Sequence, residues 1–343
     1  MLVGIPEGSD RKAKAMKRIG HIFHKIIDTD NLYLAYQKAK KGKSKRYGVT
    51  LFEKNLDQNI MQIQSELISG TYKTSTYDVF TIYEPKERIV YRLPFRDRIV
   101  HHAIVNIMEE IWNSIFVTGT YSCIKGRGIH KALRHIKRDL NDVENTKYCL
   151  KFDIKKFYPN IDHEILKMIV KKKIKDKQLL SVLDEIIDSA PGIPIGNYLS
   201  QFFANLYLSY FDHWLKEEKK VKYYYRYCDD IVILGADKPQ LHVLLAEINY
   251  YLTFNLNLQI KDNYQVFPIE KRGIDFVGYV FYHTHILLRK TIKKNFCKKT
   301  ARLNKKNIEP KEYRKRIASH LGWAKHCNAK HLTKKIVKYE EVL

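Results

Sequence analysis

Apolar residues recur at two distinct spacings along the chain, and these divide it into predicted helices and strands. Helical spacing predicts helices over residues 10–40, 51–68, 98–112, 129–140, 198–210 and 240–252, and over most of the chain after residue 289. Short runs of β-branched and aromatic residues predict strands over 148–152, 223–227 and 231–234, and hairpins over 79–91 and 276–288. The chain is therefore predicted to mix helices with hairpins, and its sequence contains no internal repeat.

The composition adds a core and a strong positive charge to this picture. Of the 343 residues, 45% are hydrophobic and 12% aromatic, which allows a substantial core and excludes disorder for most of the chain. The net charge of +25 gathers at the ends, with +8 over residues 1–50, +14 over 284–343 and only +3 between them. Basic ends around a near-neutral centre favour an enzyme whose flanks grip a phosphate backbone, although any single charge cluster also fits a solvated face.

Cysteine usage and the uncharged stretches indicate the compartment. The five cysteines include no C-x-x-C pair and no zinc spacing, which indicates a reducing compartment and no structural zinc. The longest uncharged stretch, 189–211, contains prolines, glycines and amides that a lipid-facing helix could not satisfy, so no membrane span is expected. The N-terminus has no signal-peptide pattern, and we expect a cytoplasmic protein.

The candidate chemistry lies in aspartates at strand ends. Asp229 and Asp230 separate two apolar strands, and Asp153 ends another apolar strand. The adjacent pair alone fits a solvent turn equally well, because Asp tolerates turn geometry. If the strand ends converge, the three carboxylates can hold two Mg²⁺ ions about 4 Å apart, which stabilise the attacking and leaving oxygens of an in-line displacement. Lys261 is then a candidate general acid toward pyrophosphate.

A nucleotide substrate would require cations for its triphosphate and a surface for its sugar. Lys86 and Arg88, at the tip of the first hairpin, are the best local supply of positive charge. Tyr158 follows Asp153 closely enough to stack on the sugar and exclude a 2′-hydroxyl, although it also fits a core aromatic. The Gly-Arg-Gly turn at 126–128 would let a nucleic-acid strand approach the backbone, and chain geometry explains it equally well.

Several ordered motifs resemble those of reverse transcriptases. They are Asp153 with Phe157 and Tyr158, the segment 196–200, the Tyr-Cys-Asp-Asp segment 227–230 and the segment 276–279. The basic stretch 86–98 and the turn 125–128 resemble the finger motifs of the group II intron and retroelement branch, so the resemblance covers roughly residues 75–330. It implies an α+β right-hand polymerase with fingers, a palm of antiparallel sheet plus helices, and a helical thumb.

The resemblance also implies a division of the chain and a set of roles. Residues 1–118 would form an N-terminal helical extension and fingers, 119–283 the palm with a fingers insertion at about 162–195, and 284–343 the basic thumb. The implied catalytic acids are Asp153, Asp229 and Asp230, which with the backbone of Ile154 would hold the metal ions. The implied nucleotide-binding residues are Lys86, Arg88, Tyr158, Ile195, Gly196, Gln201 and Lys261, and the nucleic-acid-binding residues are Arg96, Arg98, Lys125, Arg127 and Trp323.

The segment from Ile195 to Gln201 most resembles the reverse transcriptases of diversity-generating retroelements. That family has an aliphatic-Gly-x-x-x-Ser-Gln segment where most reverse transcriptases have Gln-Gly-x-x-x-Ser-Pro. It implies a bacterial or phage enzyme that uses dNTPs and two Mg²⁺ ions, binds template RNA and RNA/DNA duplex, copies a template-repeat RNA into adenine-mutagenised cDNA, and works with a small basic accessory protein. The alternatives are a defence-type, retron-like or CRISPR-associated reverse transcriptase, or a noncatalytic RNA-binding scaffold.

Overall fold

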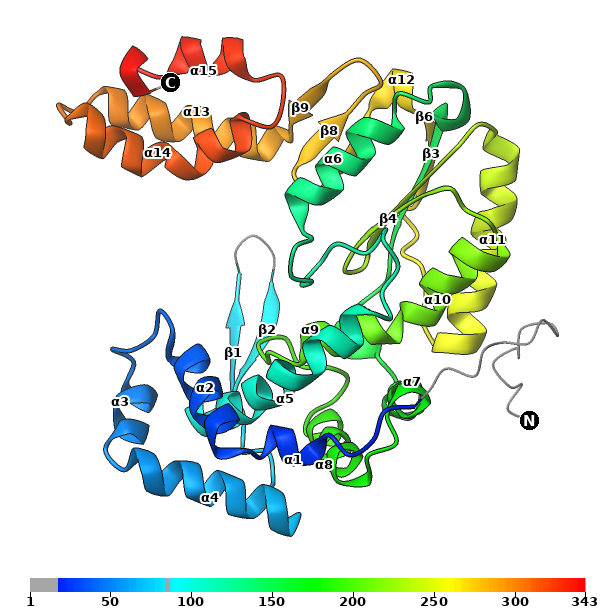
Figure 1. The fold of residues 1–343 in the computed structure, drawn as a ribbon. Coiled ribbons are helices and arrows are strands. Elements are labelled where there is room, and N and C mark those ends of the chain that lie inside the picture. The colour runs from blue at the N-terminus through cyan, green and yellow to red at the C-terminus, as the bar shows by residue number, and fades with distance from the viewer. Residues whose placement is uncertain (1–17, 84–86, 343) are drawn as a thin grey trace. The chain divides into compact units, whose positions relative to one another are not determined.

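The computed structural model describes residues 18–83 and 87–342, which form two compact units (Figure 1). The first unit combines the chain up to Val117 with Ile154–Glu218 and Asn249–Gln259. The second combines Thr118–Asp153, Lys219–Ile248 and Ile260–Leu343. Lys86, a predicted triphosphate ligand, lies outside the described residues.

The first unit is mainly helical and contains one two-stranded sheet. Its elements are α1 (Phe23–Ile26), α2 (Thr29–Lys40), α3 (Tyr47–Glu53), α4 (Leu56–Ser69), β1 (Asp78–Ile82), β2 (Arg88–Arg92), α5 (Phe95–Asn113), α7 (His163–Lys173), α8 (Lys177–Asp188), α9 (Ser200–Tyr207) and α10 (Ser209–His213). Strands β1 and β2 pair in antiparallel fashion. Among the described helices of the chain, none is both long and apolar enough to cross a membrane.

Helices α2 and α5 pack together at the centre of the first unit. Their facing residues, including Leu32 and Ala35 of α2 and Ile99 and Ala103 of α5, are fully buried. Apolar spacing of three and four residues places these side chains on one face of each helix. Asn31 is the polar exception, and its Nδ2 donates to the Ala103 carbonyl at 3.1 Å, which ties the two helices together.

Three predicted helices are each interrupted in the structure, and the one predicted over 198–210 is α9 and α10, which are separated at Leu208. The segment predicted as one helix over 10–40 is described from residue 18, and its helix begins at Phe23 and restarts at Thr29. The restart follows from Asp28, whose side chain accepts hydrogen bonds from the backbone N–H groups of Asp30 and Asn31. The predicted helix over 51–68 is α3 and α4, which are separated at Lys54 and Asn55.

The second unit is built on a four-stranded antiparallel sheet with the order β4-β5-β3-β6. Its elements are α6 (Ile129–Asp139), β3 (Tyr148–Asp153), β4 (Tyr223–Tyr227), β5 (Asp230–Gly235), β6 (Gln265–Pro268), α12 (Ile269–Arg272), β7 (Ile274–Phe276), β8 (Tyr279–Phe281), β9 (Ile286–Leu288), α13 (Lys290–Asn304), α14 (Pro310–Ala324) and α15 (Lys330–Ile336). Helix α11 (Lys238–Leu256) has residues in both units.

The core of the second unit joins the main sheet to its helices. The apolar face of α6, with Ala132, Leu133 and Ile136, belongs to the same buried cluster as Tyr225 and Val232 of the sheet. The three C-terminal helices α13, α14 and α15 pack on one another (Figure 1). The aromatic and β-branched content of β4 and β5 explains why these strands are buried on both faces.

The sheet differs from the sequence prediction in two places. Strand β6 was not predicted, because it has only four residues and ends in a proline, which suits the edge position it occupies. The hairpin predicted over 276–288 is a three-stranded sheet, β7-β8-β9. Val277 and Gly278 have φ angles of +44° and +89°, so they form a turn where the prediction continued a strand.

The buried His101 of α5 gives the fold a dependence on acid pH. His101 is 1% exposed, and neither of its ring nitrogens has a hydrogen-bond partner. Burial, with a smaller effect of the positive charge on His102 and Arg98, lowers the pKa of His101 to about 3. In the unfolded chain the imidazole pKa returns to about 6.5. The stability that the neutral ring preserves is therefore fully present above about pH 6.5 and is lost as the pH falls toward 3.

We expect this residue alone to lower the free energy of unfolding by about 2 kcal/mol between about pH 7.5 and pH 5. Denaturant titrations at both pH values measure the loss, and His101→Leu should remove about that much of the pH dependence. His24→Leu is the matched control, because His24 lies exposed on α1. An unchanged pH slope in the His101→Leu protein would contradict the expectation.

Candidate active site

The β4–β5 hairpin presents Cys228 and Asp229 in a two-residue loop. Tyr227 and Asp230 form the last cross-strand pair, so only two residues connect the strands. Cys228 has a φ of +56°, as the first loop position of a type II′ turn requires. The fully buried Arg226 donates from Nη1 to the Cys228 carbonyl at 3.1 Å. The loop is thus held by its own strand as well as by the pairing.

Strand β3 brings a third carboxylate to this hairpin. Asp153 is the last residue of β3, and the antiparallel register places it directly opposite Asp230 on β5. Opposed residues in such a pair point to the same face, with Cβ atoms about 4.5–5.5 Å apart. The sheet therefore brings together acids that are far apart in the sequence, as their convergence at one site requires.

Burial and mutual repulsion make this a costly cluster for negative charge. Burial, followed by the neighbouring Asp153, raises the pKa of Asp229 to about 7. Burial also raises the pKa of Asp230, against the opposing effect of the nearby Lys151. The Oδ1 atoms of Asp153 and Asp230 are buried and accept no hydrogen bond. The arrangement therefore needs positive charge close to these oxygens.

Two lysines supply part of that charge. The Lys261 Nζ donates to Asp153 Oδ2 at 2.5 Å, and the Lys261 N–H donates to the Asp153 carbonyl at 2.9 Å. The Lys151 Nζ lies 3.5 Å from Asp230 Oδ1 and also donates to the Asp275 carbonyl. Lys261 was a predicted site residue, and in the structure it is bonded to Asp153, one of the candidate catalytic acids. Lys151 was not predicted, although its position two residues before Asp153 on a strand places both on one face.

The donor set suits a hard divalent cation. Three carboxylates, two of them with a buried oxygen that accepts no hydrogen bond, are the oxygen ligands that Mg²⁺ prefers. As the side chains stand, no three His, Cys, Asp or Glu groups in the described part of the chain are arranged to hold an ion. Ile154, the predicted backbone ligand, follows Asp153 and is fully buried, so only its backbone could take part.

A cavity of about 270 Å³ lies beside Asp153 and Asp230 in the second unit. Its walls come from β3, β5, β6 and the segment after α12. The residues that line it are mainly polar: Lys151, Phe152, Asp153, Asp230, Asn263, Gln265, Phe267, Arg272, Gly273 and Asp275. Arg272 and Lys151 give this cavity the cations that a phosphate-bearing group requires.

The second unit also holds three predicted nucleic-acid-binding residues. Lys125 is exposed, and Arg127 donates from Nη1 to the Thr120 carbonyl at 3.0 Å. Trp323 of α14 is partly buried, and its ring lies 5.2 Å from that of Tyr279. Lys125 is therefore directed to solvent, whereas Trp323 contributes to packing between α14 and the β7-β8-β9 sheet.

The predicted nucleotide-binding residues other than Lys261 that the structure describes belong to the first unit. They are Arg88, Tyr158, Ile195, Gly196 and Gln201. Arg88 and Gln201 are exposed, and Tyr158 is partly buried in a short 3₁₀ turn. The Ile195 carbonyl accepts a hydrogen bond from the Tyr91 N–H at 2.8 Å. This bond attaches the segment at 195 and 196 to strand β2, which also carries Arg88.

Arg96 and Arg98 were also predicted to bind nucleic acid. Both side chains are partly buried within the first unit. Arg96 forms an ion pair with Glu66 and lies over the Tyr72 ring at 5.8 Å. Arg98 is partly buried, its Nε has no hydrogen-bond partner, and burial lowers its pKa. The contacts of Arg96 stabilise the packing of α4 against the start of α5.

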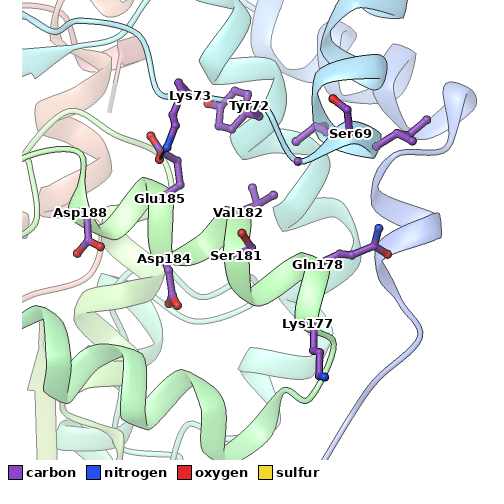
Figure 2. Close-up of a pocket in the computed structure, with 13 residues that line it drawn as sticks. Ser69, Tyr72, Lys73, Lys177, Gln178, Ser181, Val182, Asp184, Glu185 and Asp188 are labelled. Carbon is purple, nitrogen blue, oxygen red and sulfur yellow. Dashed lines mark hydrogen bonds and ion pairs between the residues drawn. The ribbon is translucent and has the colours of Figure 1, made fainter.

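Another cavity, of about 440 Å³, lies in the first unit between the end of α4 and α8 (Figure 2). None of the described residues predicted from the sequence lines it. Lys73 reaches Glu185 at 2.7 Å, and Glu185 also accepts from the Thr74 N–H at 3.1 Å. Asp188 is bonded by Lys167 at 2.7 Å. The bonds of Glu185 connect the segment after α4 to α8, and the bond of Asp188 connects α8 to α7.

More than half of the chain matches one protein family. Residues 84–281 of the 343 match the family described as reverse transcriptase (RNA-dependent DNA polymerase). The chain belongs to the reverse transcriptase family. The match begins just before β2 and ends with β8, so it includes both the β4–β5 hairpin and Asp153. Membership implies a nucleotidyltransferase that depends on a divalent metal ion, generally Mg²⁺.

Individual relatives place this reverse transcriptase near intron-encoded proteins. It is 26% identical to protein YkfC of Escherichia coli (strain K12) over 290 residues, which cover 70% of this chain and 74% of YkfC. It is also 26% identical over 220 residues to the group II intron-encoded protein LtrA of Lactococcus lactis subsp. cremoris, covering 58% of this chain and only 35% of LtrA. The predicted group II intron-like relationship is thereby confirmed.

A solved structure supports the fold at lower sequence similarity. Telomerase from Candida albicans, determined with a fragment of telomeric RNA, superposes with a TM-score of 0.50 at 13% identity. The superposition covers 79% of this chain and 58% of the telomerase chain. The predicted α+β polymerase fold is confirmed.

Proposed function

We propose that this reverse transcriptase synthesises DNA on an RNA template, with Asp153, Asp229 and Asp230 as its catalytic acids. The observation that carries the proposal is the cross-strand pair of Asp153 and Asp230 beside Asp229 in the hairpin loop. Structural acids seldom gather where burial raises their pKa values, whereas active sites commonly hold them so. A scaffold that only binds RNA would have no use for this costly arrangement.

The three aspartates and the Ile154 carbonyl are the proposed ligands of two Mg²⁺ ions. When bound, such a pair stabilises the attacking 3′ oxygen and the leaving pyrophosphate of an incoming dNTP. Asp153 and Asp230 would contribute the buried oxygens that lack a hydrogen-bond partner. Lys261, already at Asp153 Oδ2, is the proposed proton donor to pyrophosphate. Lys151 would hold the Asp230 carboxylate in position.

The remaining roles follow the family resemblance. We assign residues 1–118 with 162–195 to an N-terminal extension and fingers, the rest of 119–283 to the palm, and 284–343 to a basic thumb. Lys86 and Arg88 would bind the triphosphate, Tyr158 would contact the sugar, and Ile195, Gly196 and Gln201 would line the base pocket. Arg96, Arg98, Lys125, Arg127 and Trp323 would contact the template RNA and the RNA/DNA duplex, and the exposed Lys125 is the best placed for a phosphate.

Primer extension on an RNA template with Mg²⁺ and dNTPs tests this function. We expect DNA products whose sequence copies the template, and no products when the ions are chelated. RNA binding without extension would instead favour the noncatalytic scaffold. Addition of nucleotides without copying would favour an enzyme of the same fold that polymerises without a template.

Within the family, we propose a diversity-generating retroelement enzyme that copies a template-repeat RNA with errors at adenine. Support comes from the segment Ile195 to Gln201, where an aliphatic side chain replaces the usual amide. A small basic accessory protein is the proposed partner. We also propose a location in the cytoplasm of a bacterium, because the cysteine spacing indicates a reducing compartment. Retron-like and CRISPR-associated enzymes are the alternatives, and a template repeat beside the gene would distinguish them.

The substitution Ile195→Gln is expected to lower misincorporation at template adenines by roughly tenfold, because one added hydrogen bond to the base pair is worth about 1–1.5 kcal/mol. The Ile195 backbone is held by the Tyr91 N–H, so the change should act through the side chain alone. Sequencing of extension products measures the error rate at each template base. Ile68→Gln, at an exposed position of α4, serves as the control. An unchanged adenine error rate would count against the role of position 195.

A further inference from the structure

Two cysteines from different parts of the sequence lie beside the catalytic hairpin. The segment at Gly119 and Tyr121 is bonded to Arg226 at the end of β4: the Arg226 N–H donates to the Gly119 carbonyl at 2.8 Å, and the Tyr121 N–H donates to the Arg226 carbonyl at 3.0 Å. Cys123 lies two residues after Tyr121, and Cys228 lies two residues after Arg226. Both have left-handed backbones, with φ angles of +57° and +56°. The two backbone segments therefore turn at the same level of the sheet.

The two thiols contact the same side-chain hydroxyl group, that of Ser122. Ser122 Oγ lies 3.2 Å from Cys123 Sγ and 2.9 Å from Cys228 Sγ, so the sulfur atoms are within two hydrogen-bond lengths of each other. Cys123 is exposed and Cys228 is partly buried, which leaves the pair open to a small reagent. The fully buried Cys149 of β3 has no such access.

We propose that Cys123 and Cys228 form a reversible modification site, where a low-molecular-weight disulfide converts the two thiols to an intramolecular disulfide and thereby inactivates the hairpin that carries Asp229. The site is distinct from the proposed chemistry of polymerisation, in which neither cysteine takes part. Its formation does not depend on the proposed function, whereas its effect on DNA synthesis does.

The exchange proceeds in two balanced steps. The Cys123 thiolate attacks one sulfur of the reagent, forms a mixed disulfide and releases the first thiolate. Cys228, after losing its proton to solvent, attacks the Cys123 sulfur, closes the intramolecular bond and releases the second thiolate. The two cysteines are oxidised by two electrons, the reagent is reduced to two thiols, and the two cysteine protons end on those products.

The surroundings of Cys123 favour the first step. Hydrogen bonds from Cys228 and Ser122 lower the pKa of Cys123 to about 6, against the opposing effect of burial. A thiolate is the attacking form, and a pKa near the ambient pH gives a high thiolate fraction without much loss of nucleophilicity. Burial raises the pKa of Cys327 to about 11 and that of Cys149 further, so both are expected to react slowly.

Closing the bond would displace the hairpin loop. A disulfide holds its sulfur atoms about 2.05 Å apart with a dihedral near 90°, whereas hydrogen-bonded thiols are separated by more than 3 Å. The loop contains only Cys228 and Asp229, so movement of one residue is transmitted to the other. A carboxylate that is to hold a metal ion tolerates a displacement of only a few tenths of an ångström.

Incubation of the full chain with oxidised glutathione tests the site. We expect an intact mass lower by two hydrogens, a peptide that joins residues 123 and 228, and reversal by dithiothreitol. Cys123→Ser and, as a second variant in case that protein folds poorly, Cys228→Ala should each abolish the joined peptide. Cys297→Ser is the matched control, because Cys297 is a partly buried cysteine that should leave the bond unaffected.

Primer extension before and after oxidation tests the consequence. We expect at least a tenfold loss of extension on oxidation, restored by dithiothreitol, and no loss in the Cys123→Ser protein. A stable mixed disulfide at Cys123, or linkage of other cysteine pairs, would overturn the assigned site. Linkage of 123 to 228 with undiminished extension would overturn the inactivation. Linkage in a protein that shows no extension even when reduced would support the site and refute the proposed polymerase.

Discussion

Primer extension by the Asp229→Asn variant is expected to fall by at least about a thousandfold, with the fold intact. Asp229 lies in a two-residue loop beside the cross-strand pair of Asp153 and Asp230, so its carboxylate is one of the proposed ligands that would hold the metal ions. An amide of the same shape keeps the packing but removes the charge that holds a divalent cation. Initial rates at saturating dNTP and Mg²⁺ measure the loss.

The same substitution should leave stability unchanged or increase it, which separates a functional defect from a folding defect. The folded-state pKa of Asp229 is raised to about 7 by burial and by Asp153. A carboxyl group with a raised folded-state pKa destabilises the fold above its unfolded pKa, most of all above about pH 7, where the buried group must ionise. Thermal melts at about pH 8 should therefore show no loss in Asp229→Asn.

Asp262→Asn is the matched control for this experiment, because Asp262 is exposed and adjoins Lys261 in the same unit. It removes one negative charge near the site without touching a proposed ligand. We expect its extension rate to remain within about twofold of the parent, since exposed charges are screened. Full extension activity in Asp229→Asn would refute the role of Asp229 as a catalytic acid, and equal losses in the two variants would indicate a general effect of charge.

The strands of the catalytic hairpin were predictable because their local sequence strongly favours β-structure. Residues 223–227 are predicted and observed as a strand, since a run of aromatic residues followed by turn-forming aspartates leaves few alternatives. The pairing partner of each strand was harder to predict. Register depends on contacts between segments far apart in the chain. The chemistry of Asp153 and Asp230 therefore suggested that they meet, whereas their spacing in the sequence does not determine which residues pair.

Three features escaped prediction for related reasons. Strand β6 is too short for periodicity, and its pairing with β3 defines it. The break between α3 and α4 leaves the apolar spacing intact, and the structure shows the Asn59 amide satisfying the Phe52 carbonyl there. Cys123 and Cys228 are brought together by the backbone hydrogen bonds of Arg226 with Gly119 and Tyr121. No local sequence pattern predicts these bonds.

Gly196→Ala is expected to lower the free energy of unfolding by roughly 2–4 kcal/mol. The glycine has a φ of +123°, which L side chains rarely adopt, and a Cβ atom built there would clash with the Tyr91 carbonyl oxygen. The Tyr91 N–H meanwhile donates to the Ile195 carbonyl, so the two backbones cannot separate without losing that bond. Denaturant titration of the purified variant measures the loss.

Gly42→Ala separates the two contributions to this loss. Gly42 also has a positive φ, +71°, but an added Cβ atom would meet nothing within 4 Å, so that variant carries backbone strain of about 1 kcal/mol without a clash. The excess loss in Gly196→Ala then measures how closely the segment at 195 and 196 must approach β2. Equal losses would mean that the segment at 195 and 196 can move away from β2. The assumption of a rigid backbone, on which the Ile195 experiment depends, would then be wrong. A larger loss would mean that strand β2 and the proposed base pocket form one rigid element, in which Ile195 and Arg88 have fixed relative positions.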